Sequence, residues 1–123
     1  MDTNIKEQKI GKLRIFFKSG ETVKGEKFMH KLFPKNKYSK ILDEAKKAGI
    51  MNAHIFQTHA AYEQGSKVAH YSMETDNSGL TVCLGLVDTK EKLESFFVTH
   101  KAMLDSKTAI FTEVEFWAFN DKI

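Results

Sequence analysis

Apolar and polar positions alternate along four segments of this chain in the way that β-strands require. Residues 12–18 read KLRIFFK, so Leu13, Ile15 and Phe17 share one face, and mostly basic side chains occupy the other. Residues 50–59, 80–88 and 108–119 predict three more strands. The run at 80–88 has almost no polar interruption, which indicates a strand that is central in its sheet or covered on both faces.

Two segments between these strands show helical spacing instead. Either Asn36 or Ser39 can cap a first helix, whose apolar positions recur up to residue 48, and Gly49 is a natural stop. A second helix is expected after Asp88 as the cap, with Glu91 completing a capping box. The expected buried stripe of this helix consists of Leu93, Phe96, Phe97, His100 and Leu104.

The order of elements is strand, helix, strand, long connection, strand, helix, strand. This order predicts an α+β fold of the ferredoxin-like, split βαβ kind, in a single domain over residues 1–123. Both faces of the last strand are apolar, since Ile110 and Phe116 alternate with Phe111 and Trp117. Helices can cover only one of these faces. We therefore expect a homo-oligomer that packs through its sheets.

The connection between the second and third strands, residues 60–78, is long and polar and has almost no helical periodicity. Two neighbouring strands need only a few connecting residues, and a long loop without secondary structure in a compact domain is usually functional or disordered. We therefore predict a sensing or docking element here.

The cysteine content and the apolar runs of the chain indicate the compartment of the protein. The only cysteine among the 123 residues, Cys83, lies in an apolar run, which fits a reducing environment and excludes an internal disulfide. The apolar runs are too short to cross a bilayer, and the N-terminus has no apolar signal core. A cytoplasmic location is expected.

The formal charge of +3 is unevenly spread. A group of lysines lies before the first helix and in its first turn. These lysines are either a solvated surface or a contact for phosphates, nucleic acid or an acidic partner. No aromatic ribonucleoprotein motif supports nucleic acid, so none is expected as a partner. These lysines are Lys24, Lys27, Lys31, Lys35, Lys37 and Lys40.

Residue types suited to catalysis are present, but their spacing does not form a known site. No two of His54, His59 and His70 have the i, i+4 spacing of a helical zinc site, and His54 and His59 are expected on opposite faces of the second strand. No phosphate-binding glycine loop of the GxxxxGK or GxGxxG type occurs. We predict neither a catalytic residue nor a metal ligand.

Four segments together resemble the PII-like proteins, and more narrowly a small uncharacterised PII-like branch. They read KLRIFF, EAKKAGI, AHIFQ and LVDTKEKLESFF, and the resemblance covers residues 11–119. It implies a homotrimer of ferredoxin-like subunits with the sheets packed inward. It also implies an adenine nucleotide, or another small effector, in the clefts between subunits. Residues 60–78 would then be the T-loop, which docks on a membrane transporter or an enzyme.

The resemblance also assigns residues. The nucleotide-binding positions that it implies are His54, Thr58, Gly85, Leu86, Val87, Asp105 and Lys107. The positions implied for the T-loop and its partner are Tyr62, Gly65, Lys67 and Tyr71. The glycines of the PII loop base fall near Ala60 and Tyr62, and two phosphate-binding arginines fall at Ala118 and Asn120. With these groups missing, ADP or AMP is expected rather than ATP, unless Lys67 or the lysine-rich segment supplies charge.

Two other functions are compatible with the same residues. One is a small enzyme of the dimeric α+β barrel kind, with His54 or His59 beside Phe56 and Trp117 in an apolar pocket. The other is a metal-responsive binding module that uses His59 and His70 in the long loop.

Overall fold

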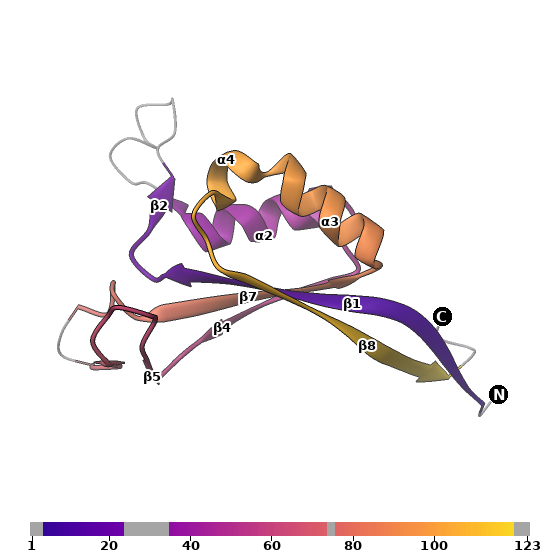
Figure 1. Cartoon of the computed structure of the whole chain (residues 1–123), viewed down its shortest axis with the longest axis horizontal. Helices are drawn as coiled ribbons and strands as arrows, with labels where there is room; N and C mark the ends of the chain where they lie inside the picture. The colour runs from indigo at the N-terminus through magenta and orange to yellow at the C-terminus, as the bar shows by residue number, and fades with distance from the viewer. Residues whose placement is uncertain (1–3, 24–34, 74–75, 120–123) are drawn as a thin grey trace.

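The computed structural model describes residues 4–23, 35–73 and 76–119. Four antiparallel strands form the main sheet in the order β4-β7-β1-β8. Their bounds are β1 Ile5–Lys18, β4 Asn52–Gln57, β7 Thr81–Asp88 and β8 Ala109–Phe119. The helices α2 (Lys37–Lys47), α3 (Lys90–Thr99) and α4 (Lys101–Leu104) lie on one face of this sheet (Figure 1). The predicted ferredoxin-like order is confirmed.

The core lies between the sheet and the helices. Leu13, Ile15 and Phe17 are buried on the helix side of β1, as their alternation predicted. Ile41 from α2 and Leu93 from α3 are almost fully buried against them. Complete burial of such a side chain contributes about 1.5–3 kcal/mol. These contacts fix both helices on one face and leave the opposite face of the sheet for other contacts.

Two strands, β1 and β4, differ in length from the prediction. β1 begins at Ile5 rather than at residue 12, because its polar first half pairs with the end of β8, from Ile5 opposite Phe119 to Gly11 opposite Glu113. This two-stranded arm extends beyond the helices (Figure 1). β4 ends at Gln57, so His59 lies in the loop and not on the strand. The predicted opposite-face relation of His54 and His59 is therefore wrong.

The helix ends are set by local hydrogen bonds. Gly49 has φ 76°, which favours glycine, and follows α2 as predicted. The cap of α3 is Thr89, not Asp88, because the Thr89 side chain accepts a 3.3 Å hydrogen bond from Lys92 N. Asp88 instead accepts hydrogen bonds of 2.8 Å from Met51 N and 2.7 Å from Thr89 N. It thus joins the start of β4 to the end of β7.

The long loop contains secondary structure of its own, which its polar and aperiodic sequence does not reveal. β5 (Ala60–Ala61) pairs with β6 (Ala69–His70) in a short hairpin. Ser66 and Glu63 exchange hydrogen bonds of 2.8 and 2.9 Å across its turn, where Gly65 has φ 82°. A second short pair joins β2 (Thr22–Val23) to β3 (Lys35–Asn36) ahead of α2. No helix in the described ranges is long and apolar enough to span a membrane.

Candidate functional site

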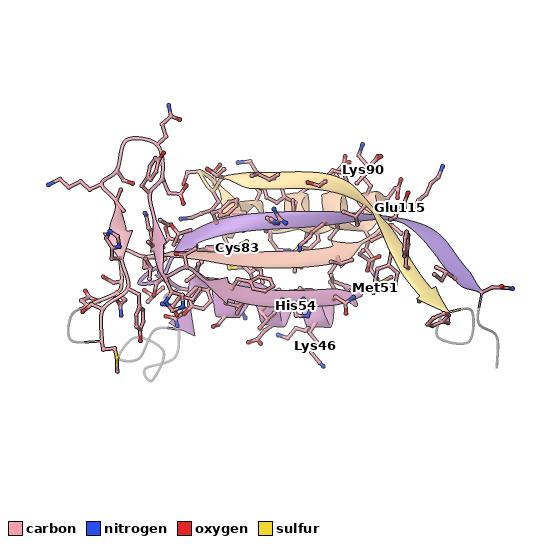
Figure 2. All side chains as sticks on the ribbon, turned by 90° about the horizontal axis from the view of Figure 1, so that it is seen from below. Lys46, Met51, His54, Cys83, Lys90 and Glu115 are labelled. Atoms are coloured by element: carbon pink, nitrogen blue, oxygen red, sulfur yellow. The ribbon has the colours of Figure 1, made fainter. Side chains whose placement is uncertain are left out.

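The sheet face opposite the helices carries basic and apolar side chains together. On this face Arg14 lies between Gly85 of β7 and Ile110 of β8, and the backbone of Gly85 is paired in turn with His54 of β4. Figure 2 looks onto this face, with His54 on the edge strand β4 and Cys83 on the neighbouring strand β7. Phe56, next to His54 on this face, is 54% exposed. An exposed apolar and basic surface of this kind is typical of an interface.

The predicted base-binding residues divide between the two faces. His54 is exposed on the open face, with its ring 6.1 Å from that of Phe56. Val87 is half-buried on the same face, opposite Lys12 and Asn52. Leu86 points the other way and is fully buried in the core. The Leu86 side chain therefore cannot contact a ligand on the open face. The predicted apolar contact of Leu86 with the base is wrong.

A small cavity of about 170 Å³ lies where β1 ends and β8 begins. Lys107 projects into it and forms a close ion pair with Glu21, and its Nζ lies 5.8 Å from the centre of the Phe17 ring. Ser106 precedes it with φ 67°, a left-handed conformation that glycine adopts more readily. The cavity is lined by Phe16, Phe17, Lys18, Glu21, Glu63, Ser106, Lys107 and Thr108.

The base of the long loop is attached at this cavity. The Thr81 hydroxyl donates a 2.9 Å hydrogen bond to Glu63 Oε1, and Glu63 also lines the cavity. Thr58, a predicted ligand residue, is held at the same end of β7, because its hydroxyl donates a 2.7 Å bond to the Thr81 carbonyl. The structure therefore brings Thr58, Glu63 and Lys107 to one end of the sheet.

The other predicted residues do not line this cavity. Gly85 is four residues beyond Thr81 on β7, which is roughly 13 Å along a strand. Asp105 is exposed, does not line the cavity and pairs with Lys101 at 3.3 Å. Glu21 and Glu63 were not expected in the site. Each is one polar residue in a polar segment, and no sequence signal distinguishes it from its neighbours.

The predicted T-loop residues lie on the surface of the hairpin. Tyr62 is 69% exposed, and Tyr71 and Lys67 are also exposed. The Tyr71 ring meets the His59 ring edge-on, with centroids 5.5 Å apart. Val68 and Met73 add exposed apolar surface to the same loop. The hairpin thus presents aromatic and aliphatic side chains to solvent, as a docking element would.

The lysine-rich segment is only partly described. Lys24, Lys27 and Lys31 lie outside the described residues, as does Asn120. Lys40 forms a 3.1 Å ion pair with Glu44 on α2, so it belongs to the helix surface. It does not line the cavity that contains Lys107.

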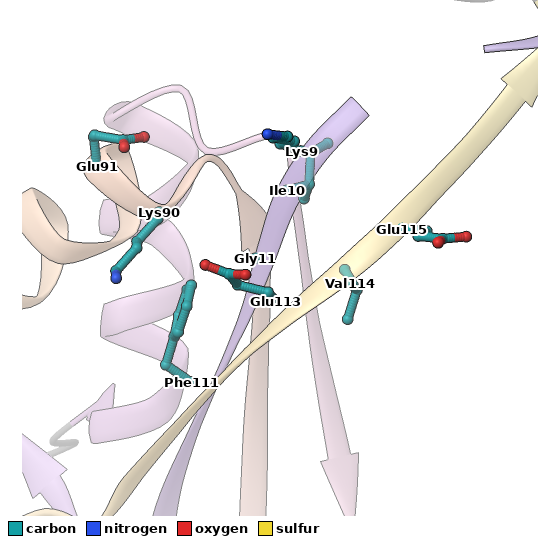
Figure 3. Close-up of a pocket in the computed structure, with 9 residues that line it drawn as sticks. All are labelled: Lys9, Ile10, Gly11, Lys90, Glu91, Phe111, Glu113, Val114 and Glu115. Carbon is teal, nitrogen blue, oxygen red and sulfur yellow. The ribbon is translucent and has the colours of Figure 1, made fainter. Parts of the chain in front are cut away.

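A larger cavity of about 430 Å³ lies at the start of α3. Figure 3 shows Lys90, Phe111 and Glu113 around it, between α3 and the arm of β1 and β8. The Phe111 ring lies directly over Gly11, where an added Cβ would be 2.2 Å from Phe111 Cε2. Charges of both signs surround this space, and none of the residues that the resemblance assigned lines it.

The two alternative sites are not assembled within one chain. His54 lies on β4 and Trp117 on β8, which are the two outer strands of the sheet. His59 is in the loop, so the predicted pocket of histidine, Phe56 and Trp117 does not form. Among the described residues, no three histidine, cysteine or acidic side chains lie close enough to hold a metal ion. His59 and His70 therefore have no third ligand there.

Comparisons with known proteins agree with this fold. The DUF190 family, described as Uncharacterized ACR, COG1993, matches residues 10–116. A UPF0166 protein from Aquifex aeolicus (strain VF5) is 27% identical over 84 residues, which are 68% of this chain and 71% of that protein.

Two solved structures have the same fold at low sequence identity. CPII from Thiomonas intermedia K12, a nitrogen regulatory PII-like protein solved with ADP and bicarbonate, superposes with a TM-score of 0.55 at 11% identity, over 95% of both chains. A protein from Thermus thermophilus, assigned as a PII-like signaling protein, superposes with a TM-score of 0.52 at 14% identity, over 99% of this chain and 97% of the other. The chain therefore belongs to the DUF190 family and has the PII-like fold.

Proposed function

We propose that this protein is a PII-like signal-transduction protein that works as a homotrimer in the cytoplasm. It binds an adenine nucleotide, ADP or AMP rather than ATP, or a related small effector, in the clefts between subunits. Its T-loop, residues 60–78, then acts on a partner such as a membrane transporter or an enzyme. One observation carries the proposal: Glu63 of the loop and Lys107 of the α4–β8 connection line the same cavity.

That arrangement couples a ligand to the loop. An anion that reaches Lys107 changes the charge beside Glu63, whose carboxylate holds the loop base to Thr81. Because a ligand shifts a conformational equilibrium only through different contacts with its two states, a ligand that touches the loop base directly has the required effect. The exposed side chains of Tyr62 and Tyr71 would transmit the change to a partner.

A second subunit is needed to complete the site. The cavity of about 170 Å³ is smaller than the 300–1,000 Å³ typical of small-molecule pockets. The open sheet face beside it exposes apolar side chains such as Phe56 and Ile110. A neighbouring subunit that covers this face would bury them and extend the cavity. His54 and Gly85 lie roughly 13 Å from the Lys107 end along the strand, a distance that an extended nucleoside diphosphate can bridge.

The nature of the ligand follows from the available cations. A phosphate needs basic side chains or backbone N–H donors, and Lys107 and Lys18 are the basic residues of the cavity. Two lysines that face two glutamates suit a ligand of low negative charge. That CPII was solved with ADP, and in other crystals with ADP and AMP, supports an adenine nucleotide for this fold.

Thermal unfolding in the presence of nucleotides tests the proposal. A ligand at about 100 times its Kd adds about 2.7 kcal/mol to the free energy of unfolding, which raises Tm by several degrees. We expect ADP or AMP to produce this shift in the wild-type protein and not in Lys107→Gln. Lys46→Gln is the matched control, because Lys46 is an exposed lysine on α2, remote from the cavity.

The ligand-induced shift is compared within each variant, because loss of the Lys107 charge also changes the stability without ligand. Light scattering should give a trimer. If millimolar AMP, ADP and ATP all leave the Tm of the wild-type protein unchanged, the adenine-nucleotide assignment is wrong.

A further inference from the structure

We infer that Glu21, assisted by Glu63, is the residue that limits the negative charge of the ligand at this site. The inference rests on the proposed function and deepens it. It is based on the carboxylates that line the cavity, and not on the glycines and arginines of the PII pattern that are missing from this chain. The cavity lining contains two lysines, Lys18 and Lys107, and two glutamates, Glu21 and Glu63, so the formal charges cancel.

Glu21 is held firmly in place. Its backbone N–H donates a 3.1 Å hydrogen bond to the Lys18 carbonyl, and its own carbonyl accepts a 2.9 Å bond from Lys37 N at the start of α2. These bonds fix the backbone at the wall of the cavity, and the ion pair with Lys107 holds the carboxylate there. An incoming phosphate must occupy a site in which this negative charge remains.

The carboxylate of Glu21 is also poorly compensated. One oxygen pairs with Lys107, whereas Oε2 is buried and has no hydrogen-bond partner in the described part of the chain. Glu21 is only partly buried, but a carboxylate in such a place still loses stability when its cation is withdrawn. A ligand phosphate must therefore bind Lys107 while Lys107 remains paired with Glu21. The free Oε2 can meanwhile accept a hydrogen bond from a ligand hydroxyl or amino group.

Each further phosphate charge is then repelled by a fixed charge close by. In a partly buried site this repulsion is much stronger than in water, because the effective dielectric constant is lower. Glu63 adds a second negative charge on the loop side, and its Oε1 remains bound to Thr81. A monophosphate or diphosphate is thus favoured over a triphosphate by the residues that are present.

Affinities of two ligand series test the inference in the wild-type protein and in Glu21→Gln. The first series is AMP, ADP and ATP, and the second is phosphate, pyrophosphate and tripolyphosphate, all measured by titration calorimetry at fixed ionic strength. We expect Glu21→Gln to raise the affinity for ATP relative to AMP by about tenfold. Tripolyphosphate should gain similarly over phosphate. Glu63→Gln should give a smaller change in the same direction. It replaces Glu21→Gln as the test variant if Glu21→Gln does not fold.

Glu94→Gln is the matched control, because Glu94 is an exposed glutamate on α3 outside this cavity. It removes the same formal charge and should leave both ratios unchanged. If nucleotides bind and neither Glu21→Gln nor Glu63→Gln changes the ATP to AMP ratio, the inference is wrong and the nucleotide site stands. If no nucleotide binds and the ratio of tripolyphosphate to phosphate affinity rises in Glu21→Gln, the inference holds and the adenine-nucleotide assignment fails. Binding of none of the six ligands overturns both.

Discussion

The Thr81 hydroxyl donates a 2.9 Å hydrogen bond to Glu63, so the first turn of the long loop is fastened to the strand β7. Thr81 is buried, and its carbonyl also accepts from Thr58 where β4 ends. The first residue of β7, Thr81, therefore binds both Glu63 in the first turn of the loop and Thr58, which precedes the loop. In the proposed function, a change in the charge around Glu63 would act on the loop through this contact.

Removal of the Thr81 hydroxyl should loosen the loop without unfolding the domain. Thr81→Val keeps the shape of the buried side chain and removes the donor to Glu63, a loss of about 1 kcal/mol. We expect faster amide hydrogen exchange in residues 60–73 and a small decrease in Tm. Thr112→Val on β8 is the control, since Thr112 is exposed. Unchanged exchange in Thr81→Val would show that the contact does not hold the loop.

Gly11 should tolerate a side chain only when Phe111 is removed. The added Cβ of Gly11→Ala would lie 2.2 Å from Phe111 Cε2, so the ring must move away. We expect urea unfolding to show a loss of about 1–3 kcal/mol for Gly11→Ala. In a Phe111→Ala background the same change should cost less, with a coupling energy of at least about 0.5 kcal/mol.

Gly79→Ala provides the comparison for Gly11→Ala, because an added Cβ there meets no atom within 4 Å. Its free energy of unfolding should stay close to that of the wild-type protein. Equal effects of Gly11→Ala with and without Phe111 would contradict the packing of the ring over Gly11.

Glu44 should titrate below the ordinary range of a glutamate. A hydrogen bond from Lys40 is the main cause that lowers the pKa of Glu44, and the charges of Lys47 and Lys40 add to it. Because the pKa is lower in the folded state, the associated stability is present above the unfolded-state pKa and is lost as the pH falls through the folded-state pKa. Lys40→Gln should move the NMR titration midpoint of Glu44 upward. Lys46→Gln, on the same helix, should not; a Glu44 midpoint at the ordinary value in the wild-type protein would be inconsistent with this contact.

Cys83 should react slowly with alkylating reagents at neutral pH. Burial raises the pKa of the Cys83 thiol, and the nearby charges of Arg14 and Lys12 oppose this only in part. Since the thiolate is the reactive form, the pH profile of iodoacetamide labelling should be displaced to higher pH than that of a free thiol. Arg14→Gln should displace it further, and Lys9→Gln, an exposed lysine on the arm, should have little effect. A profile at the ordinary thiol pH would contradict the burial of this side chain.

The sequence predicted those features that depend on neighbouring residues. The alternation of Leu13, Ile15 and Phe17 identified the buried face of β1, and Gly49 identified the end of α2, because both are local properties of the backbone. The first half of β1 was missed, since its polar residues are strand only through pairing with β8. Pairing of this kind between distant segments leaves no local pattern.

In the candidate site, the sequence predicted only the residues that the family resemblance assigns. Lys107 was expected from the resemblance, and the structure places it in a cavity. Glu21 and Glu63 meet Lys107 through the fold alone, from segments far apart in the chain. Ser106 shows a further reason: it has a left-handed conformation that glycine adopts more readily. A search for glycines therefore misses a backbone shape that the surrounding structure imposes.

The hydrogen bonds inside the long loop determine how it can respond to a ligand. Besides the Glu63 and Ser66 turn, Asn77 closes the far end with hydrogen bonds of 2.9 and 2.7 Å to the backbone of Ser72. Ordering the backbone of a free residue costs about 1–2 kcal/mol. The described part of this loop has met that entropic cost already during folding. In the proposed function, a partner that contacts Tyr62 or Tyr71 would therefore bind residues that are already ordered, and would not have to order them itself.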